Sequence, residues 1–304
     1  MRPWEWEEPA WRAAVGAVRA GRRAAPPWPG GAAVAVALSF DADGETPWLR
    51  EGVTTPGGLS AGEFGPRVAT PRVLRLLAEH DAPSTFFFPG VAALLHPPEV
   101  LAVLEGGHEI GAHGWIHERP EALTATEEHD LVHRTLDVLE AATGTRPCGW
   151  RTPSFGFSAH TLEILLEAGM LYDSSLMADD EPYELLLHGR PTGMVEVPVD
   201  WSRDDAAFFV MDRWGGVRPV PRPRDVLQAW TDEYRAARRS GGLFQLTMHP
   251  DLIGRRSRLV VLAELLEEMT ADGDVWFATH AQVAAHCREA LETPCRSTAE
   301  DGRA

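Results

Sequence analysis

The stretch AVAVALSFDADG (residues 33–44) indicates how this chain folds. It is a short, mostly apolar run that ends in two carboxylates, Asp41 and Asp43, followed by Gly44. A short apolar run without polar alternation is typical of a strand buried on both faces, as in parallel sheets. The stretch therefore predicts a buried strand with acidic side chains at its carboxyl end, although acidic residues in this place are also common in ordinary turns.

Similar runs recur along the chain and alternate with helical patterns. Further strands are predicted over 84–88, 108–112, 148–151, 171–174, 195–199, 243–248 and 274–277. Helices are predicted after an N-cap at Thr70, after a capping box at Thr124 and Glu127, and over 158–169, 224–239, 258–270 and 281–291. This order predicts an α/β fold, and we expect a distorted (β/α) barrel. On pattern alone a doubly wound open sheet fits equally well.

We expect three parts in the chain: an N-terminal arm (1–30), one catalytic domain (31–292) and a polar C-terminal tail (293–304). Residues 44–69 are rich in Gly and Pro and are expected to form a long loop. Two further excursions are expected at 175–194 and 202–223. Loops of this length in a compact domain are usually lids or subunit contacts.

The composition excludes several classes of protein. The 304 residues include 28 Lys and Arg against 45 Asp and Glu, a formal charge of −17, which argues against a nucleic-acid surface or an anionic membrane as partner. The longest apolar run is about half of what spans a bilayer, and the chain starts without a basic signal region, so we expect a cytoplasmic protein. The cysteines (Cys148, Cys287 and Cys295) lack CxxC spacing, so we expect reduced thiols.

Two histidines, His113 and His117, directly follow the strand expected at 108–112. At a spacing of i and i+4 they share a face if the segment is a helical turn, which is the spacing zinc hydrolases use on a helix. A divalent ion would need a carboxylate as third ligand, and Asp41 or Asp43 can supply it. The alternative is a chance pair of surface or core histidines.

Two more groups suited to catalysis follow later strands. Arg151, in Arg151-Thr-Pro153, can clamp a carboxylate or keep an aspartate ionised, although a surface arginine is the plainer interpretation. His249 ends the strand expected at 243–248 and can protonate a leaving amine if a nearby carboxylate, such as Asp200, raises its pKa. A satisfied core histidine is the alternative. The occurrence of all these residues, in order, at successive strand ends favours a catalytic site.

The ordered motifs resemble those of the polysaccharide deacetylase family, also called the NodB-homology or carbohydrate esterase family 4 group. The resemblance extends over about residues 33–287. The family motifs Thr-Phe-Asp-Asp-Gly, His-x3-His, Arg-x-Pro, Asp-Trp and Leu-x-His resemble residues 39–44, 113–117, 151–153, 200–201 and 246–249. Residues 40–45, 86–90, 107–114, 175–177 and 248–251 are similar to a subgroup with peptidoglycan deacetylase-like, cyclic imide hydrolase and allantoinase-like members.

The resemblance implies a distorted (β/α) barrel of the NodB-homology type and a homotetramer. It implies that a divalent metal, zinc, is bound by Asp43, His113 and His117. It also implies that Asp41 is the catalytic base and is oriented by Arg151, while Asp200 supports His249 as the acid. Two departures bear on these roles: Ala42 separates the two acidic residues, and Ser154 replaces the tyrosine that often follows Arg-x-Pro, which alters a backbone contact to the oxyanion.

We therefore expect a metal-dependent hydrolase of a non-peptide C–N amide bond. The missing export signal and the long loops favour a small intracellular substrate, such as a cyclic imide or ureide. An N-deacetylase of an N-acetylated sugar or peptidoglycan-type glycan is the alternative, and a non-catalytic scaffold or binding module is a further one. Trp48, Trp115 and Trp201 lie beside the motifs and are candidates for the walls of an apolar pocket, or for core packing.

Overall fold

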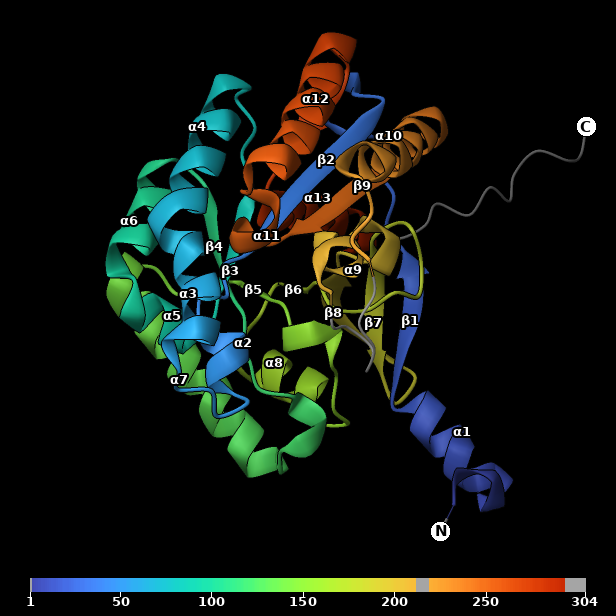
Figure 1. Ribbon diagram of the computed structural model, residues 1–304. Coiled ribbons are helices and arrows are strands. Elements are labelled where there is room, and N and C mark those ends of the chain that lie inside the picture. Colours follow the sequence, from blue (N-terminus) through green and yellow to red (C-terminus); the bar gives the residue numbers. More distant parts are fainter. Residues whose placement is uncertain (1, 212–218, 293–304) are drawn as a thin grey trace, which may run out of the picture.

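The computed structural model describes residues 2–211 and 219–292, and within them ten strands form one curled sheet (Figure 1). The strands are β1 (Val18–Arg23), β2 (Val34–Asp41), β3 (Thr85–Phe88), β4 (Glu109–Ala112), β5 (Gly149–Trp150), β6 (Tyr172–Asp173), β7 (Tyr183–Leu187), β8 (Arg190–Glu196), β9 (Leu243–Met248) and β10 (Val275–Phe277). Their order is β1-β7-β8-β6-β5-β4-β3-β2-β10, with β9 also paired to β2. Only the pairs β1·β7 and β7·β8 are antiparallel among these described strands.

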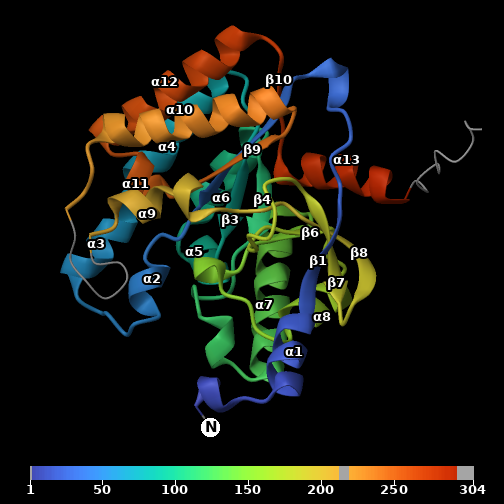
Figure 2. The same cartoon turned by 90° about the vertical axis from the view of Figure 1, so that its right-hand side faces the viewer.

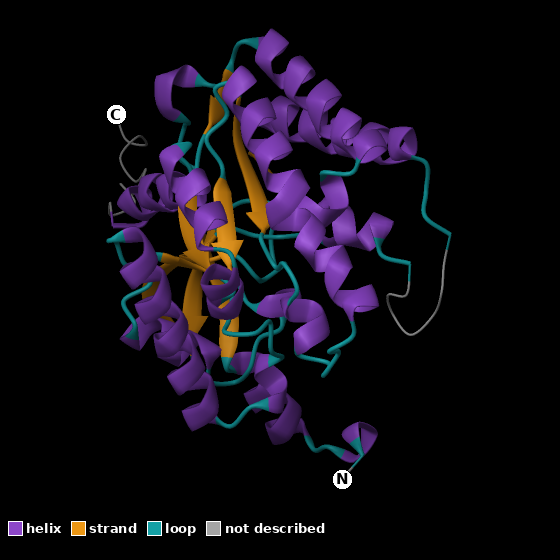
Figure 3. Ribbon diagram, turned by 60° about the vertical axis from the view of Figure 1, so that its left-hand side comes forward, coloured by secondary structure: helices purple, strands orange, loops and turns teal. Residues whose placement is uncertain are grey.

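Helices surround this sheet (Figure 3). They are α1 (Glu8–Gly16), α2 (Thr46–Leu49), α3 (Pro56–Phe64), α4 (Thr70–Glu79), α5 (Gly90–Leu95), α6 (Pro97–Glu105), α7 (Ala125–Thr143), α8 (Thr161–Glu167), α9 (Asp205–Phe209), α10 (Pro223–Ser240), α11 (Pro250–Ile253), α12 (Arg256–Asp272) and α13 (His280–Glu292). α10 and α12 lie side by side (Figure 2). None of the described helices is long and apolar enough to cross a membrane. The curled sheet with its surrounding helices confirms the distorted (β/α) barrel.

The two faces of the sheet differ in character because side chains alternate along each strand. All of β2 is buried, as its apolar sequence predicted. Val34, Val36, Leu38 and Phe40 pack outward in the main core beneath the helices. Ala35 and Ala37 face the other way, into a smaller core that α13 covers. Small residues in this second core leave room inside the curled sheet for larger side chains from its other strands.

The segment 44–69 is not the loop that its Gly- and Pro-rich composition predicted. It contains α2, α3 and a π-helical turn (Gly65–Ala69) that continues directly into α4. Thr70 is therefore inside a continuous helical segment and does not cap a new helix, which corrects the expectation for that residue. Pro56 and Pro71 each lie in the first turn of an element, where a missing N–H costs little.

The N-terminal arm expected over residues 1–30 is partly built into the sheet, because β1 pairs with β7. The Trp28 indole N–H also donates to the Gly241 carbonyl oxygen at 2.9 Å. α1 projects away from the body (Figure 1). Trp11 in α1 and Trp4 in the short turn before it are exposed, with 44% and 75% of their surface accessible. The expected excursion at 175–194 includes β7 and the start of β8. The tail at 293–304 lies outside the described residues.

Gly149 in β5 provides a test of the packing inside the sheet. A Cβ at this position would lie 1.9 Å from the Cζ atom of Tyr172, whose buried ring donates a hydrogen bond to Glu109 at 2.8 Å. Gly149→Ala should therefore lower the free energy of unfolding by about 1–3 kcal/mol, as overpacked cores do. Urea unfolding would measure it. Gly57→Ala is the control, since its Cβ meets nothing within 4 Å. Equal stability of the two variants would contradict the packing described here.

Candidate metal and catalytic site

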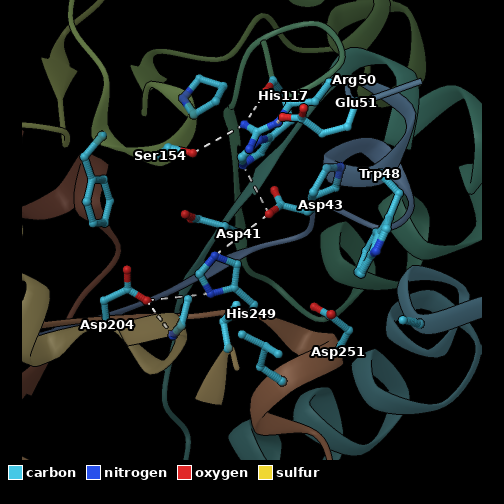
Figure 4. A pocket seen from close by; sticks show the side chains of 18 of the residues that line it. Asp41, Asp43, Trp48, Arg50, Glu51, His117, Ser154, Asp204, His249 and Asp251 are labelled. Atoms are coloured by element: carbon cyan, nitrogen blue, oxygen red, sulfur yellow. Dashed lines mark hydrogen bonds and ion pairs between the residues drawn. The ribbon is translucent and has the colours of Figure 1, made fainter. Parts of the chain in front are cut away.

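The polar residues that follow the parallel strands meet beside one cavity of about 1490 Å³ (Figure 4). Asp41 is the last residue of β2, while His113, Arg151 and His249 directly follow β4, β5 and β9. Because parallel strands place their carboxyl ends on the same edge of the sheet, residues far apart in sequence converge here. The structure thus brings together most of the residues that the motifs singled out.

Three of these side chains point their polar atoms toward one another. The carboxylate of Asp43 lies between two imidazoles, with Oδ1 at 3.5 Å from His113 Nε2 and Oδ2 at 3.4 Å from His117 Nε2. The three residues are only 5%, 0% and 6% exposed. One carboxylate and two imidazoles are a donor set that zinc and similar divalent ions accept. The described residues therefore include a possible Asp-His-His metal site.

The two histidines do not share a helical turn, which corrects the expectation from their spacing. Residues 113–117 form an irregular loop, in which Gly114 and His117 have left-handed φ angles of 72° and 62°. Glycine adopts this conformation without strain, and at position 114 an added Cβ would also lie 2.8 Å from Pro153. The chain reversal brings the imidazole centroids within 5.1 Å of each other.

Two atoms of this cluster are buried without a hydrogen-bond partner: Oδ1 of Asp43 and Nε2 of His113. The His113 Nδ1–H donates to the Arg151 carbonyl oxygen at 2.8 Å, which leaves the Nε2 lone pair directed at Asp43. Burial lowers the pKa of His113 to about 4, so this ring is neutral at pH 7. Burial raises the pKa of Asp43 well above its usual range, so its negative charge is costly without a counter-ion, and a cation between the two atoms would satisfy both. Asp43 and His113 therefore fit a metal ion as they stand.

His117 has a competing partner that the sequence did not reveal. Its Nδ1 lies 2.7 Å from Nη1 of Arg50, and a guanidinium can only donate. The neutral His117 ring then carries its proton on Nε2, the atom that faces Asp43. An ion bound through Nε2 requires that proton to move to Nδ1 and Arg50 to give up this contact. His117 thus fits the metal site after one tautomer change.

A second group of possible ligands lies nearby but is already satisfied. Asp204, Asp205 and His249 also place their polar atoms within 4.8 Å of one another. Here, however, Asp205 Oδ1 accepts from His249 Nδ1 at 2.7 Å, and Oδ2 accepts from the His249 backbone N–H at 3.1 Å. Asp204 accepts from the Ala206 N–H at 2.7 Å. The polar atoms of this second cluster are hydrogen-bonded to one another or to backbone N–H groups, whereas the Asp43–His113–His117 cluster has unpartnered atoms. The Asp43–His113–His117 cluster therefore fits a metal better.

Asp41 is held by a buried arginine. Arg151 Nη1 donates to Asp41 Oδ1 at 2.8 Å and also contacts the Ser39 hydroxyl at 2.8 Å. The remaining Arg151 donors are fixed by Ser174, through its carbonyl at 2.9 Å and its hydroxyl at 2.8 Å. Burial alone would raise the pKa of Asp41, but the charge and hydrogen bond of Arg151, together with the nearby His113 and His249, outweigh it and hold the pKa below its usual range. Asp41 is therefore ionised, with Oδ2 at 3.7 Å from His113 Nε2.

His249 is supported by Asp205, not by the expected Asp200. Asp200 instead caps the short 3₁₀ turn Trp201–Arg203 by accepting from the Ser202 N–H at 2.7 Å. That turn brings the following residues against β9, where Asp204 bridges to Thr247. Asp205, the next residue, then faces the histidine. Nothing in the sequence around Asp205 predicted that it would pair with His249.

The charge of Asp205 sets the protonation of His249. Burial lowers the pKa of this ring, but the carboxylates of Asp205, Asp204 and Asp43 together raise it well above its usual value.

Two of the three tryptophans beside the motifs, Trp48 and Trp201, line the cavity. Trp115 does not line it, and packs under the Arg134 guanidinium at 3.8 Å from the ring centroid.

Replacing Asp205 by Asn should lower the pH at which His249 loses its proton. The variant removes the negative charge at Nδ1, so the pKa of the ring should fall by about one pH unit or more. NMR titration of the ring resonances in the metal-free protein would measure this. The ion pair between Asp205 and protonated His249 stabilises the fold fully below about pH 6.5, the pKa of a histidine in the unfolded chain. This stabilisation is lost as the pH rises through the higher pKa of His249 in the folded protein. Asp200→Asn is the control and should titrate like the wild type. Titration of Asp205→Asn at the wild-type pH would contradict this pairing.

Comparisons with known proteins agree with this fold. The family model for polysaccharide deacetylase matches residues 62–172. The chain is 30% identical to the peptidoglycan deacetylase of Helicobacter pylori over 279 residues, or 83% of this chain and 95% of that protein. A crystal structure from Mycobacterium smegmatis, described as a polysaccharide deacetylase, is 36% identical with a TM-score of 0.84, covering 91% and 97% of the two chains. Puue allantoinase is 26% identical with a TM-score of 0.75, covering 86% and 93%.

The fold and these relatives define a hydrolase that acts on carbon–nitrogen bonds other than peptide bonds. Within that class, the chain belongs to the polysaccharide deacetylase family.

Proposed function

We propose that this protein is a metal-dependent hydrolase that cleaves the C–N bond of a small cyclic imide or ureide. Two buried atoms without a hydrogen-bond partner, Asp43 Oδ1 and His113 Nε2, support the metal dependence, because they face each other at 3.5 Å. Asp43, His113 and His117 would hold the ion, which we propose to be zinc. When bound, such an ion polarises the amide carbonyl and lowers the pKa of water beside it.

The residues around the cluster have contacts that suit proton transfer. Asp41 is ionised and oriented by Arg151, and it accepts the proton that the attacking water loses. His249 is protonated beside Asp205 and donates its proton to the departing nitrogen. When the substrate is a ring, hydrolysis opens it and gives one product, which carries the new carboxylate at one end and the released amide or ureido nitrogen at the other.

The contacts also support a division of labour between the two aspartates that Ala42 separates. Asp41 bonds to Arg151, whereas Asp43 lies between the two imidazoles. We therefore assign the base to Asp41 and the metal ligand to Asp43.

The backbone of Ser154 and Phe155, both with φ of 56°, is strained next to this site, as functional loops often are.

The choice of a small substrate rests on the relatives and on the loops beside the cavity. The cavity walls come from the segments 41–61, 117–122, 153–156, 201–210 and 249–258. The similarity to Puue allantoinase supports a ureide, and the name of the Helicobacter pylori relative supports the alternative, an N-acetylated glycan. The exposed Trp4 and Trp11, before and within α1, support a homo-oligomer, which by family resemblance would be a tetramer.

Substitution of the two aspartates should separate metal binding from proton transfer. Asp43→Asn should lose zinc and turnover together, whereas Asp41→Asn should keep zinc and lose about 10²-fold or more in kcat, the usual contribution of a general base. Metal analysis after dialysis and steady-state kinetics would measure both. His113→Ala/His117→Ala should behave like Asp43→Asn. Retained metal and turnover in that double variant would contradict the proposal.

A substrate panel would test the choice of substrate. We expect the zinc-loaded protein to hydrolyse succinimide-type imides and cyclic ureides at least about tenfold more efficiently, in kcat/KM, than N-acetylglucosamine oligomers, in line with the similarity to Puue allantoinase. Activity on the oligomers alone would overturn the small-substrate proposal and leave the metal site unaffected.

A further inference from the structure

Two arginines, Arg255 and Arg258, line the cavity directly after α11, the short helix that follows His249. Each guanidinium is fixed by stacking on an aromatic ring. The Cζ atom of Arg255 lies 3.6 Å from the centroid of Phe64, and that of Arg258 lies 4.5 Å from the centroid of Phe209. Both side chains are half-buried.

Backbone contacts use only part of their hydrogen-bonding capacity. Arg255 Nε donates to the Asp251 carbonyl oxygen at 3.1 Å, and Arg258 Nη1 donates to the Leu252 carbonyl oxygen at 3.3 Å. A guanidinium has five N–H donors, so several on each arginine have no hydrogen-bond acceptor among the described residues. These two backbone contacts orient the pair at the end of α11.

The pair lacks the counter-charge that the other cavity arginines have. Arg50 and Arg119 both pair with Glu51, at 3.1 and 3.6 Å. Within residues 2–211 and 219–292, no carboxylate lies within 4.0 Å of the Arg255 or Arg258 guanidinium. This is unexpected in a chain with 45 acidic and 28 basic residues.

The nearby carboxylates do not replace that partner. Asp205 is engaged by His249 through both of its oxygens. Asp251, on the same side of the cavity as His249 (Figure 4), has a pKa raised by burial to about 6 and is therefore an anion at pH 7, but its carboxylate lies more than 4.0 Å from both guanidinium groups. Burial lowers the pKa of Arg258, although the charge of Asp205 opposes this, and the charge of Arg255 lowers it further. Two partly desolvated cations that line one cavity without a carboxylate of the described residues in ion-pair contact are stabilised when an anion binds to them.

We propose that Arg255 and Arg258 form an anion subsite, so that the substrate carries a carboxylate or phosphate remote from the C–N bond that is cleaved. The stacked guanidinium faces leave their N–H edges for the bidentate contacts that arginine makes with oxyanions. This inference rests on the proposed function, because it names the substrate class of the same cavity. The substrate would be an acidic amide, imide or ureide, and neutral analogues would bind poorly.

Matched substrate pairs test the subsite in the zinc-loaded protein. One pair is hydantoin-5-acetic acid and hydantoin-5-acetamide, which differ in charge at nearly equal size. The other is N-acetylglucosamine 6-phosphate and N-acetylglucosamine, which separates phosphate from carboxylate recognition. The wild type should prefer the anion in at least one pair by about tenfold or more in kcat/KM. Equal rates within both pairs would overturn the proposal.

The variants Arg255→Gln/Arg258→Gln and Arg255→Lys/Arg258→Lys identify the residues responsible. The glutamine double variant should bring the ratio of kcat/KM for the anionic and the neutral substrate close to one. The lysine double variant keeps the charge but cannot make bidentate guanidinium contacts, so it should keep part of the preference. A ratio unchanged by the glutamine pair would overturn the assignment. Circular dichroism would check folding. If the glutamine double variant does not fold, the lysine double variant provides the test, and a ratio fully retained in the lysine variant would contradict the bidentate contact.

Arg72→Gln is the matched control. Arg72 also lies over Phe64, at 5.9 Å from its centroid, and donates to the Gly254 carbonyl oxygen at 3.1 Å, but it lines a separate surface groove. Its substitution should leave the ratio unchanged, and an equal loss there would contradict a specific subsite.

Binding measurements distinguish failure of the subsite from failure of the proposed function. If the wild type hydrolyses none of the four compounds, the proposed function fails for these substrates. Calorimetry of hydantoin-5-acetic acid against its amide still tests the subsite. Tenfold tighter binding of the acid to the wild type, and equal binding to the glutamine pair, would support it. Equal binding to the wild type would reject it.

Discussion

A carboxylate oxygen and an imidazole nitrogen face each other in the interior of this protein, and neither has a hydrogen-bond donor. Asp43 Oδ1 and His113 Nε2 lie 3.5 Å apart in a region closed to solvent. Such an arrangement is unfavourable by itself, since both atoms have lost water without gaining a partner. The surrounding structure holds it in place: Arg151 fixes His113 through its carbonyl oxygen and Asp41 through its guanidinium. A cation is the ligand that would stabilise this geometry.

The curled parallel sheet explains how so many polar groups are tolerated at one place. Small residues such as Ala35 and Ala37 line its inner face, which leaves space for the Arg151 side chain, and the large apolar residues pack outward under the helices. Arg151 finds partners in Ser39, Asp41 and Ser174 and is therefore buried with its charge compensated. The remaining cavity wall carries charges of both signs. Its acidic groups concentrate at the metal cluster and around His249, whereas Arg255 and Arg258 lie beyond them.

The sequence predicted the features that depend on local pattern. The apolar run before Asp41 identified the central strand, and the motif order placed the site at the carboxyl ends of parallel strands. The capping box at Thr124 predicted where α7 begins, and the Thr124 side chain indeed accepts from the Glu127 N–H. These features are encoded by neighbouring residues.

Features that depend on tertiary contacts could not be predicted in the same way. Asp205 replaces Asp200 beside His249 because a turn at Trp201–Arg203 redirects the chain against β9, and nothing in the local sequence reports that contact. The histidine pair suggested a helix by its spacing, but the left-handed Gly114 and His117 form a loop. The contact between Arg50 and His117 joins residues from separate segments and gave no sequence signal.

The most direct measurement is a zinc-edge anomalous difference map from a crystal of the zinc-loaded protein. We expect one peak between Asp43, His113 and His117, with Asp41 beside it and still bonded to Arg151. A peak between Asp204, Asp205 and His249 instead, or no peak within bonding distance of Asp43 and His113, would contradict it.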